Sequence, residues 1–195
     1  MQKISLALAI SLMIVSAVAG IGTGYWFTPQ YSMSMYDKNT MDLGQPNKWV
    51  DLRYMDAMIA HHRGAMLLAE EARKSGRTEI RDLATAILKD EPKNIDELYL
   101  WKNAWYNDSR RVRDPQVPKL GTVDKTFDLR FLNALISHHR NGILMTREIR
   151  LKSSRPEILD NADTVEQFLT TGIEMLRAWR SQWFSVSEPQ PLTVP

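Results

Sequence analysis

The sequence of 195 residues contains no cysteine, which excludes disulfide bonds, thiolate metal sites and thiol nucleophiles together. It also lacks a strong charge of one sign. With 25 basic and 23 acidic residues the formal net charge is +2, which argues against nucleic acid as a partner. No nucleophile motif, acid pair or phosphate-binding loop is present, so we expect no enzyme and no catalytic residue. Only four histidines occur, in two adjacent pairs. A metal would therefore need His, Met, carboxylate or backbone oxygen ligands.

The first 19 residues have the pattern of a signal peptide. Lys3 carries the only positive charge, residues 4–20 are uncharged, and Ala17-Val18-Ala19 fits the small-x-small motif that signal peptidase reads. Apolar residues continue to about residue 27, so an uncleaved membrane anchor is the alternative, and only then would a membrane be a partner. Both alternatives place the folded part outside the cytoplasmic membrane, and the lack of cysteine favours the periplasm.

The rest of the chain contains an internal duplication. Residues 53–63 (RYMDAMIAHHR) align with residues 130–140 (RFLNALISHHR) at an offset of 77, and a Trp-x-x-x-Trp pattern repeats at an offset of 78 (Trp101 and Trp105, Trp179 and Trp183). A loop between two helices would absorb the one-residue difference. Each copy is therefore predicted to be a helical hairpin.

Apolar residues recur with a helical period in both halves of the first copy. The first helix is expected from about residue 49 to 74, with Gly76 as its C-terminal cap. The second is expected from Thr78, its N-terminal cap, to about residue 106, with Pro92 predicted to kink or split it.

The second copy has the same organisation. Asp124 is expected to cap a third helix that ends near residue 152, and Ser154 followed by Pro156 to begin a fourth that ends near residue 184. No segment alternates with the period of a strand. We therefore predict an all-α four-helix bundle built from two duplicated helical hairpins.

The predicted bundle covers residues 48–186. A Met-containing arm of residues 28–47 precedes it, and residues 187–195, which contain three prolines, are expected to be a disordered tail.

One histidine of each pair is predicted to face the core. At 100° per residue, the first helix has a stripe within an arc of about 80° that consists of Met55, Met58, His62 and Met66. His61 lies at the edge of this stripe. In the second copy the histidine remains but aliphatic residues replace the methionines, giving Leu132, Leu135, His139 and Ile143. The tightest site is therefore expected to belong mainly to the first helix.

Imidazole and thioether together form a soft ligand set that suits Cu(I) better than Zn(II), Fe or Mg(II). Neither histidine pair has the Glu three positions before it that di-iron bundles use, which disfavours a di-iron oxidase. Methionine at helical spacing is also common core filler, so a structural bundle without metal is an alternative. The candidate metal ligands are Met33, Met35, Met41, Met55, Met58, His61, His62, Met66, His138, His139 and Met145.

The phrases Met58-Ile59-Ala60-His61-His62, with Ala65-Met66, and Leu135-Ile136-Ser137-His138-His139 resemble the His-His signature of a known family. This is a ferritin-like four-helix family long catalogued as a domain of unknown function. Its best-described members are CopM-like periplasmic copper-binding proteins, and the sequence looks like a cyanobacterial one.

The family's second helix carries Gln-x-x-Glu-Ile before Met-x-x-Trp. Here the corresponding stretches begin with Glu91 and Leu169, and Leu98 and Leu176 stand in place of the methionine. These departures argue against a ligand role for the second and fourth helices.

The resemblance implies copper binding and copper resistance outside the cytoplasm. We predict an exported protein that buffers copper, preferably Cu(I) with Cu(II) as the second candidate, or hands it to an efflux system or a membrane sensor. The alternatives are a ferritin-like metal-dependent oxidase and a metal-free structural bundle.

Overall fold

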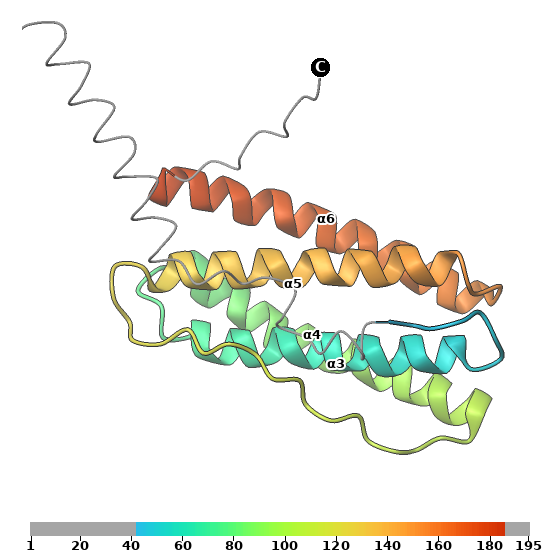
Figure 1. Cartoon of the computed structure of the whole chain (residues 1–195). Coiled ribbons are helices and arrows are strands. Elements are labelled where there is room, and N and C mark those ends of the chain that lie inside the picture. The colour runs from blue at the N-terminus through green and yellow to red at the C-terminus, as the bar shows by residue number, and fades with distance from the viewer. Residues whose placement is uncertain (1–41, 186–195) are drawn as a thin grey trace, which may run out of the picture. The chain divides into compact units, whose positions relative to one another are not determined.

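The computed structural model describes residues 42–185, all within one compact unit of the chain. This part contains four helices and no strand: α3 (Val50–Ala72), α4 (Thr78–Tyr106), α5 (Phe127–Arg150) and α6 (Pro156–Phe184) (Figure 1). The predicted all-α four-helix bundle is confirmed. Among these residues, no helix is both long and apolar enough to span a membrane. The predicted signal peptide, the tail and the arm residues Met33, Met35 and Met41 lie outside the described residues, so those predictions stay predictions.

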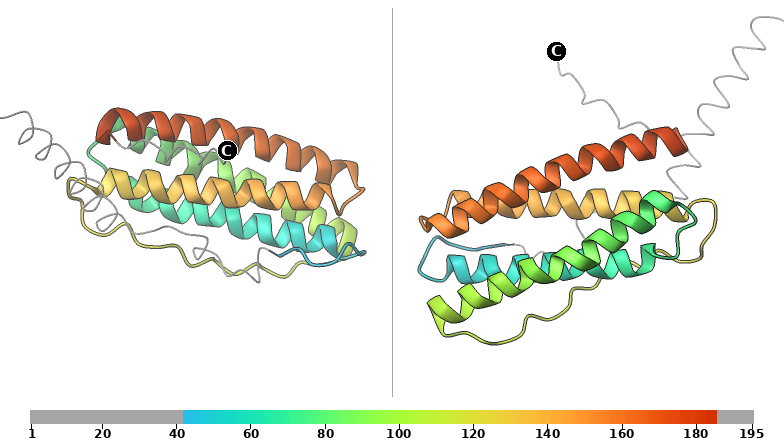
Figure 2. Two further views of the ribbon diagram at one scale, coloured as in Figure 1. Left: turned by 45° about the horizontal axis from the view of Figure 1, so that its top comes forward. Right: turned by 180° about the vertical axis from the view of Figure 1, so that it is seen from behind.

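The two hairpins pack through their first helices. Packing is extensive between α3 and α4, between α5 and α6, and between α3 and α5, whereas α4 and α6 scarcely touch each other. Figure 2 shows α3 and α5 side by side, with α4 packed on α3 and α6 packed on α5. The side of the bundle between α4 and α6 is therefore the side on which its interior is least covered.

Helical spacing sorts the buried apolar side chains into two main clusters, one toward each end of the bundle. One cluster includes Leu68, Ile80, Phe127, Phe131, Leu132 and Leu176. The other includes Tyr54, Met55, Met58, Leu98, Met145 and Ile158. Along α3 the first histidine pair lies between these clusters, so the polar rings occupy the middle of the bundle.

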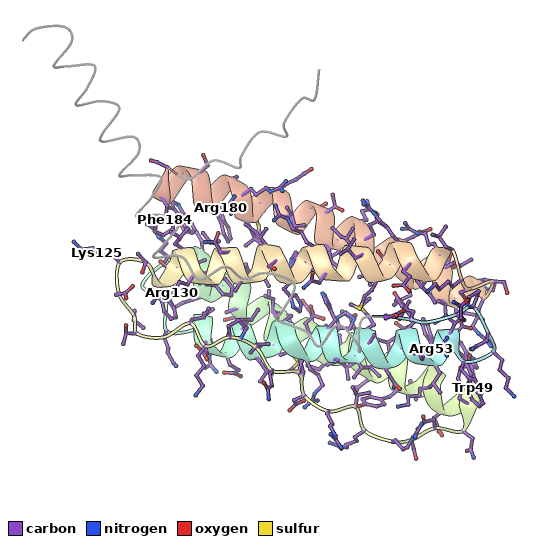
Figure 3. The ribbon with its side chains drawn as sticks, in the orientation of Figure 1. Trp49, Arg53, Lys125, Arg130, Arg180 and Phe184 are labelled. Carbon is purple, nitrogen blue, oxygen red and sulfur yellow. The ribbon has the colours of Figure 1, made fainter. Side chains whose placement is uncertain are left out.

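The duplication also includes the turn that precedes the first helix of each hairpin. Nε of Arg53 donates a hydrogen bond to the carbonyl of Leu43 at 2.5 Å, and Nε of Arg130 donates to the carbonyl of Leu120 at 2.6 Å. Figure 3 shows the two arginines at opposite ends of the bundle. The glycine after each leucine has a positive φ, +63° for Gly44 and +76° for Gly121. Residues with a side chain rarely adopt this backbone conformation. Residues 43–47, which we assigned to the arm, therefore form an ordered turn that repeats as residues 120–124.

An arginine of each hairpin stacks on a tryptophan of the other. The Arg77 guanidinium lies 4.3 Å from the Trp183 ring centroid, and that of Arg155 lies 4.2 Å from the Trp105 ring centroid. Each arginine is the N-terminal cap residue of its helix, in an extended conformation. We call these two contacts the Arg–Trp clasps.

One clasp explains why the predicted cap of the second helix is wrong. Thr78 is the first residue of α4, because the cap position belongs to the stacked Arg77. The helix α6 begins at Pro156 with Arg155 as its cap, in line with the start predicted from Ser154 followed by Pro156. Asp124, the predicted cap of the third helix, is not the cap either: Thr126 is the cap residue of α5, and Asp124 accepts the amide hydrogen of Thr126 at 2.8 Å.

The structure also differs from our predictions for Gly76 and Pro92. The helix α3 ends at Ala72 with Arg73 as its C-terminal cap in a right-handed conformation, so Gly76 is not the cap. The helix α4 runs unbroken through Pro92. Ile87 and Ile95, on either side of the proline, are both buried, so both parts of the helix pack against the bundle.

Candidate metal centre

All four histidines are buried, with between 0 and 7% of each residue exposed. Adjacent residues on a helix point about 100° apart, so the two rings of a pair face different neighbours. His61 and His138 face each other between α3 and α5, whereas His62 faces α4 and His139 faces α6. Each hairpin therefore supplies one central and one outer histidine.

The central pair is stacked. The rings of His61 and His138 are 3.8 Å apart at their centroids and inclined by 22°. Nε2 of His61 lies 3.1 Å from the backbone carbonyl of His138. Because a carbonyl can only accept, this nitrogen carries the proton and donates it. We predicted His61 at the edge of the core, but the structure places it in the centre.

Two glycines make room for the rings. A Cβ atom on Gly142 of α5 would lie 2.6 Å from Nε2 of His61, and one on Gly172 of α6 would lie 2.7 Å from Nε2 of His139. Contacts this short cannot exist, so any larger residue at either position would displace an imidazole. Our sequence analysis missed both glycines. Glycine within a helical apolar pattern is the signal that could have found them.

The outer histidine of the first hairpin has a carboxylate partner. Nδ1 of His62 lies 2.5 Å from Oε2 of Glu91, whose side chain is 12% exposed. Burial by itself would raise the pKa of Glu91, but the hydrogen bond and charge of His62 lower it. Nε2 of His62 has no hydrogen-bond partner in the described part of the chain. A carboxylate on Nδ1 orients an imidazole and leaves Nε2 available to a metal.

This contact gives the second helix a role that our sequence analysis did not foresee. The departure from the family pattern at Glu91 argued against a ligand role for α4, yet Glu91 is the residue that contacts a candidate ligand. The helical wheel showed no acid in the histidine's own stripe. It could not show that a neighbouring helix supplies one.

The outer histidine of the second hairpin has no such partner. His139 forms no hydrogen bond with any described residue, and its Nδ1 is fully buried. The Phe168 ring centroid lies 6.5 Å from that of the imidazole. The structure therefore leaves a polar ring unsatisfied beside apolar neighbours, which is costly unless something binds it.

Burial keeps three of the imidazoles, those of His61, His138 and His139, neutral. It lowers the pKa of His61 to about 3 and that of His139 to about 4, and it places the pKa of His138 well below its ordinary value. Neutral imidazole is the form that coordinates metals. These rings therefore remain competent to bind a metal in mildly acidic solution.

A cavity of about 770 Å³ extends from the region between α4 and α6 to the histidines. All four histidines line it, together with Glu91 of α4 and Met175 of α6. The ring nitrogens of His62 and His139 that lack partners among the described residues fit, in such a space, a soft metal ion that accepts imidazole and thioether ligands. Within residues 42–185, no three His or acidic side chains are arranged to hold one ion.

The structure separates most predicted methionines from this cavity. Met55, Met58 and Met145 are buried in one apolar cluster, Met66 is half-buried against it, and none of them lines the cavity. Met175, which we did not include among the ligands, does line it. The described residues thus bring the four histidines together but not the methionine stripe.

Comparison with known proteins gives the chain its family. Residues 51–119 and 128–191 match the profile described as "Domain of unknown function (DUF305)". None of the curated protein sequences matches. Solved structures of CopM are similar at 26% sequence identity. The Cu(I)-bound form has a TM-score of 0.62 and covers 70% of this chain and 99% of its own.

Two further CopM structures are similar to the same extent. The Ag-bound form obtained by co-crystallisation, at 26% identity, has a TM-score of 0.61 and covers 69% of this chain and 97% of its own. The apo form, also at 26% identity, has a TM-score of 0.61 and covers 69% of this chain and 98% of its own. The family profile spans both hairpins, and with them both histidine pairs. The chain belongs to the DUF305 family as a relative of CopM.

Proposed function

We propose that this protein binds copper in the cavity between its helices, using the outer histidines His62 and His139. The observation that carries the proposal is a pair of buried imidazoles without enough hydrogen-bond partners, both in the lining of one cavity. Similarity to structures of CopM with Cu(I) and with Ag supports it. Burial lowers the pKa of His139 to about 4, so this ring is neutral at neutral pH and copper binding to it costs no deprotonation.

The function we infer from this site is copper storage or transfer rather than catalysis. An exported protein with such a site would lower the concentration of free copper and could deliver it to an efflux system or a membrane sensor. The soft character of imidazole and thioether ligands favours Cu(I). The arm methionines Met33, Met35 and Met41 would add thioethers to the same task.

The test is a copper titration of the full chain with a competing chelator. Wild-type protein is expected to bind copper, and the double variant His62→Ala/His139→Ala to bind it at least about tenfold more weakly, which is about 1.4 kcal/mol. Circular dichroism must show unchanged helix content in the variant. The matched control is Asp82→Asn, an exposed change on α4 outside the cavity.

Three results would oppose the proposal. Wild-type protein without bound metal would favour a structural bundle. An unchanged affinity in the folded double variant would move the site elsewhere. Consumption of oxygen by the copper-loaded protein, lost in the same variant, would favour the oxidase.

A further inference from the structure

The cavity between α4 and α6 is long as well as deep. Its lining extends along α4 from Leu83 to Trp101 and along α6 from Glu157 to Leu176. At a rise of 1.5 Å per residue, each wall is about 27 Å long. Because α4 and α6 scarcely touch each other, the two walls are separate along this length. We call this feature the α4–α6 groove, and its length is that of a helix of about 18 residues.

The groove exposes large apolar side chains to solvent. Phe168 is 62% exposed and Met175 is 36% exposed, and both line the groove from α6. The duplication does not account for them, since the residues 78 positions earlier are Asp90 and Glu97. Exposed apolar side chains beside a concave apolar surface are typical of a contact surface for another molecule.

The charges that line the groove have one sign. No lysine or arginine of the described residues lines it, although the chain contains 25 of them. Five acids line it, namely Asp90, Glu91, Glu97, Glu157 and Asp160. Glu91 contacts His62, and Asp90 pairs with Lys93 at 2.7 Å. The other three acids are exposed, and none forms an ion pair with a described residue.

These three acids gather at one end of the groove. Glu97 lies one turn before Trp101, and Glu157 and Asp160 lie in the first two turns of α6 beside Ile158; Trp101 and Ile158 belong to the same apolar cluster. Leu83, Ile87 and Leu176 belong to the other cluster, so the opposite end of the groove is apolar. A complementary ligand therefore has an elongated apolar face and positive charge at one end.

We propose that the α4–α6 groove docks an amphipathic helix of a partner protein, with basic residues at the end that meets Glu97, Glu157 and Asp160. A helix placed in a groove inserts apolar side chains at positions i, i+3, i+4 and i+7, and about 18 residues cover the length available. Basic residues complement the acidic end and fix the direction of the helix. This inference goes beyond the proposed copper binding and does not depend on it.

Other occupants match the groove less well. A second copy placed on it by a two-fold axis would bring the same five acids, without a base, against the first five. Residues 28–41 of this chain contain one lysine and one aspartate, so they offer no basic end. An anionic membrane surface would be repelled by the acids.

The test uses the full chain without metal and a fluorescent 18-residue peptide as the probe. The peptide has leucine at helical spacing on one face, three lysines in one terminal turn, and alanine and glutamine elsewhere. We expect it to bind, to become helical on binding and to bind more weakly at higher salt. Phe168→Ser and the double variant Glu97→Gln/Asp160→Asn should each weaken binding by at least about tenfold in fluorescence anisotropy. The double variant should also lose most of the salt dependence.

Matched controls lie on α4 outside the groove. Leu100→Ser, at a side chain 70% exposed, and Asp82→Asn should leave the affinity unchanged. A peptide of the same composition with scrambled leucines should not bind.

The inference is wrong if the peptide does not bind, if the scrambled peptide binds equally, or if Leu100→Ser weakens binding as much as Phe168→Ser. A dimer in light scattering that Phe168→Ser dissociates would make a second copy the occupant. Binding to anionic vesicles that Phe168→Ser abolishes would make a membrane the occupant. Because the protein is free of metal, none of these results bears on copper binding, which the histidine variants test separately.

Discussion

At the scale of single residues, the site depends on the smallest side chains as much as on the histidines. The His61 ring occupies space next to Gly142, and the His139 ring occupies space next to Gly172. Glycine in the interior of a helix costs about 0.5–1 kcal/mol relative to alanine. Such a cost at two positions beside imidazoles indicates that room for the rings is worth more than helix propensity there.

Gly142→Ala should therefore destabilise the protein despite its better helix propensity. The new Cβ would lie 2.4 Å from Cδ1 of Leu169 and 2.6 Å from Nε2 of His61. Overpacking of this kind costs about 1–3 kcal/mol. Denaturant unfolding of the metal-free protein measures the loss.

Gly76→Ala is the matched control for this change. Nothing lies within 4 Å of the Cβ it would introduce, and the glycine has no positive φ. Its free energy of unfolding should stay equal or rise by about 0.4–1 kcal/mol. Equal stability of the two variants would show that the histidine can move aside.

At the scale of elements, an arginine at the start of the second helix of each hairpin packs on the other hairpin. The Arg–Trp clasps have the same geometry at both ends, and each arginine also meets an acid of the opposite first helix. Arg77 lies 3.3 Å from Asp128, and Arg155 lies 3.1 Å from Asp51. The clasps therefore join the two hairpins, whose second helices α4 and α6 scarcely touch each other.

Removing one clasp should have a modest and symmetric effect. Arg77→Ala and Arg155→Ala are each expected to lower the free energy of unfolding by about 1 kcal/mol, the scale of a cation–π contact at a partly exposed site. The double variant should lose the sum of the two, because the clasps are far apart.

Arg73→Ala serves as control, since Arg73 forms only an exposed pair with Glu70. It should change stability by less than about 0.5 kcal/mol. A large effect of only one clasp would mean that the hairpins do not depend on each other equally. Thermal and denaturant unfolding measure the stability of the two single variants, the double variant and the control.

The methionines of the arm before the bundle are expected to contribute to copper binding. Deleting residues 28–41, with Met33, Met35 and Met41, should lower the number of bound Cu(I) ions or speed their release without changing helix content. Thioether keeps its affinity for Cu(I) at acidic pH because it has no proton to lose, so the effect should persist at pH 5. A Cu(I) competition titration at pH 5 and pH 7 measures it.

A longer deletion separates this role from a structural one. Removing residues 28–47 also removes Leu43, which is fully buried, and the carbonyl that Arg53 binds. We expect that deletion to cost about 2–5 kcal/mol of stability, as for loss of a buried leucine. If the shorter deletion leaves copper stoichiometry and release unchanged, the arm methionines play no part in binding.

At the scale of the whole molecule, the neutral core makes stability depend on pH. Folding lowers the pKa of His61 to about 3 and that of His139 to about 4, against about 6.5 in the unfolded chain. Between these values the unfolded state binds more protons than the folded state. The free energy of unfolding must therefore fall as the pH is lowered through this window.

We expect the metal-free protein to lose up to about 1.4 kcal/mol per pH unit for each such histidine between pH 6.5 and about 4. Denaturant unfolding at a series of pH values measures the slope. His139→Gln should reduce this slope by the contribution of one proton, up to about 1.4 kcal/mol per pH unit. The control Asp82→Asn should leave the slope unchanged. A flat profile from pH 6.5 to 4 would mean that water or protons reach the rings in the folded state.

The sequence by itself determined the helices, their number and their duplication. Helical periodicity is a local property, and an offset of 77 residues can be measured without any structure. The burial of His62 and of the methionine stripe also followed, because an angle on a helix depends only on residue spacing. The family signature around both histidine pairs was read from the same local segments.

Only the tertiary structure decided what each histidine meets. Glu91 beside His62, Gly172 beside His139 and Met175 in the cavity come from other helices, 29 or more residues away in the chain. The turn at residue 43 and the arginine caps likewise depend on contacts between the hairpins. The rotation and separation of packed helices follow from all their side chains together, and no single segment contains that information.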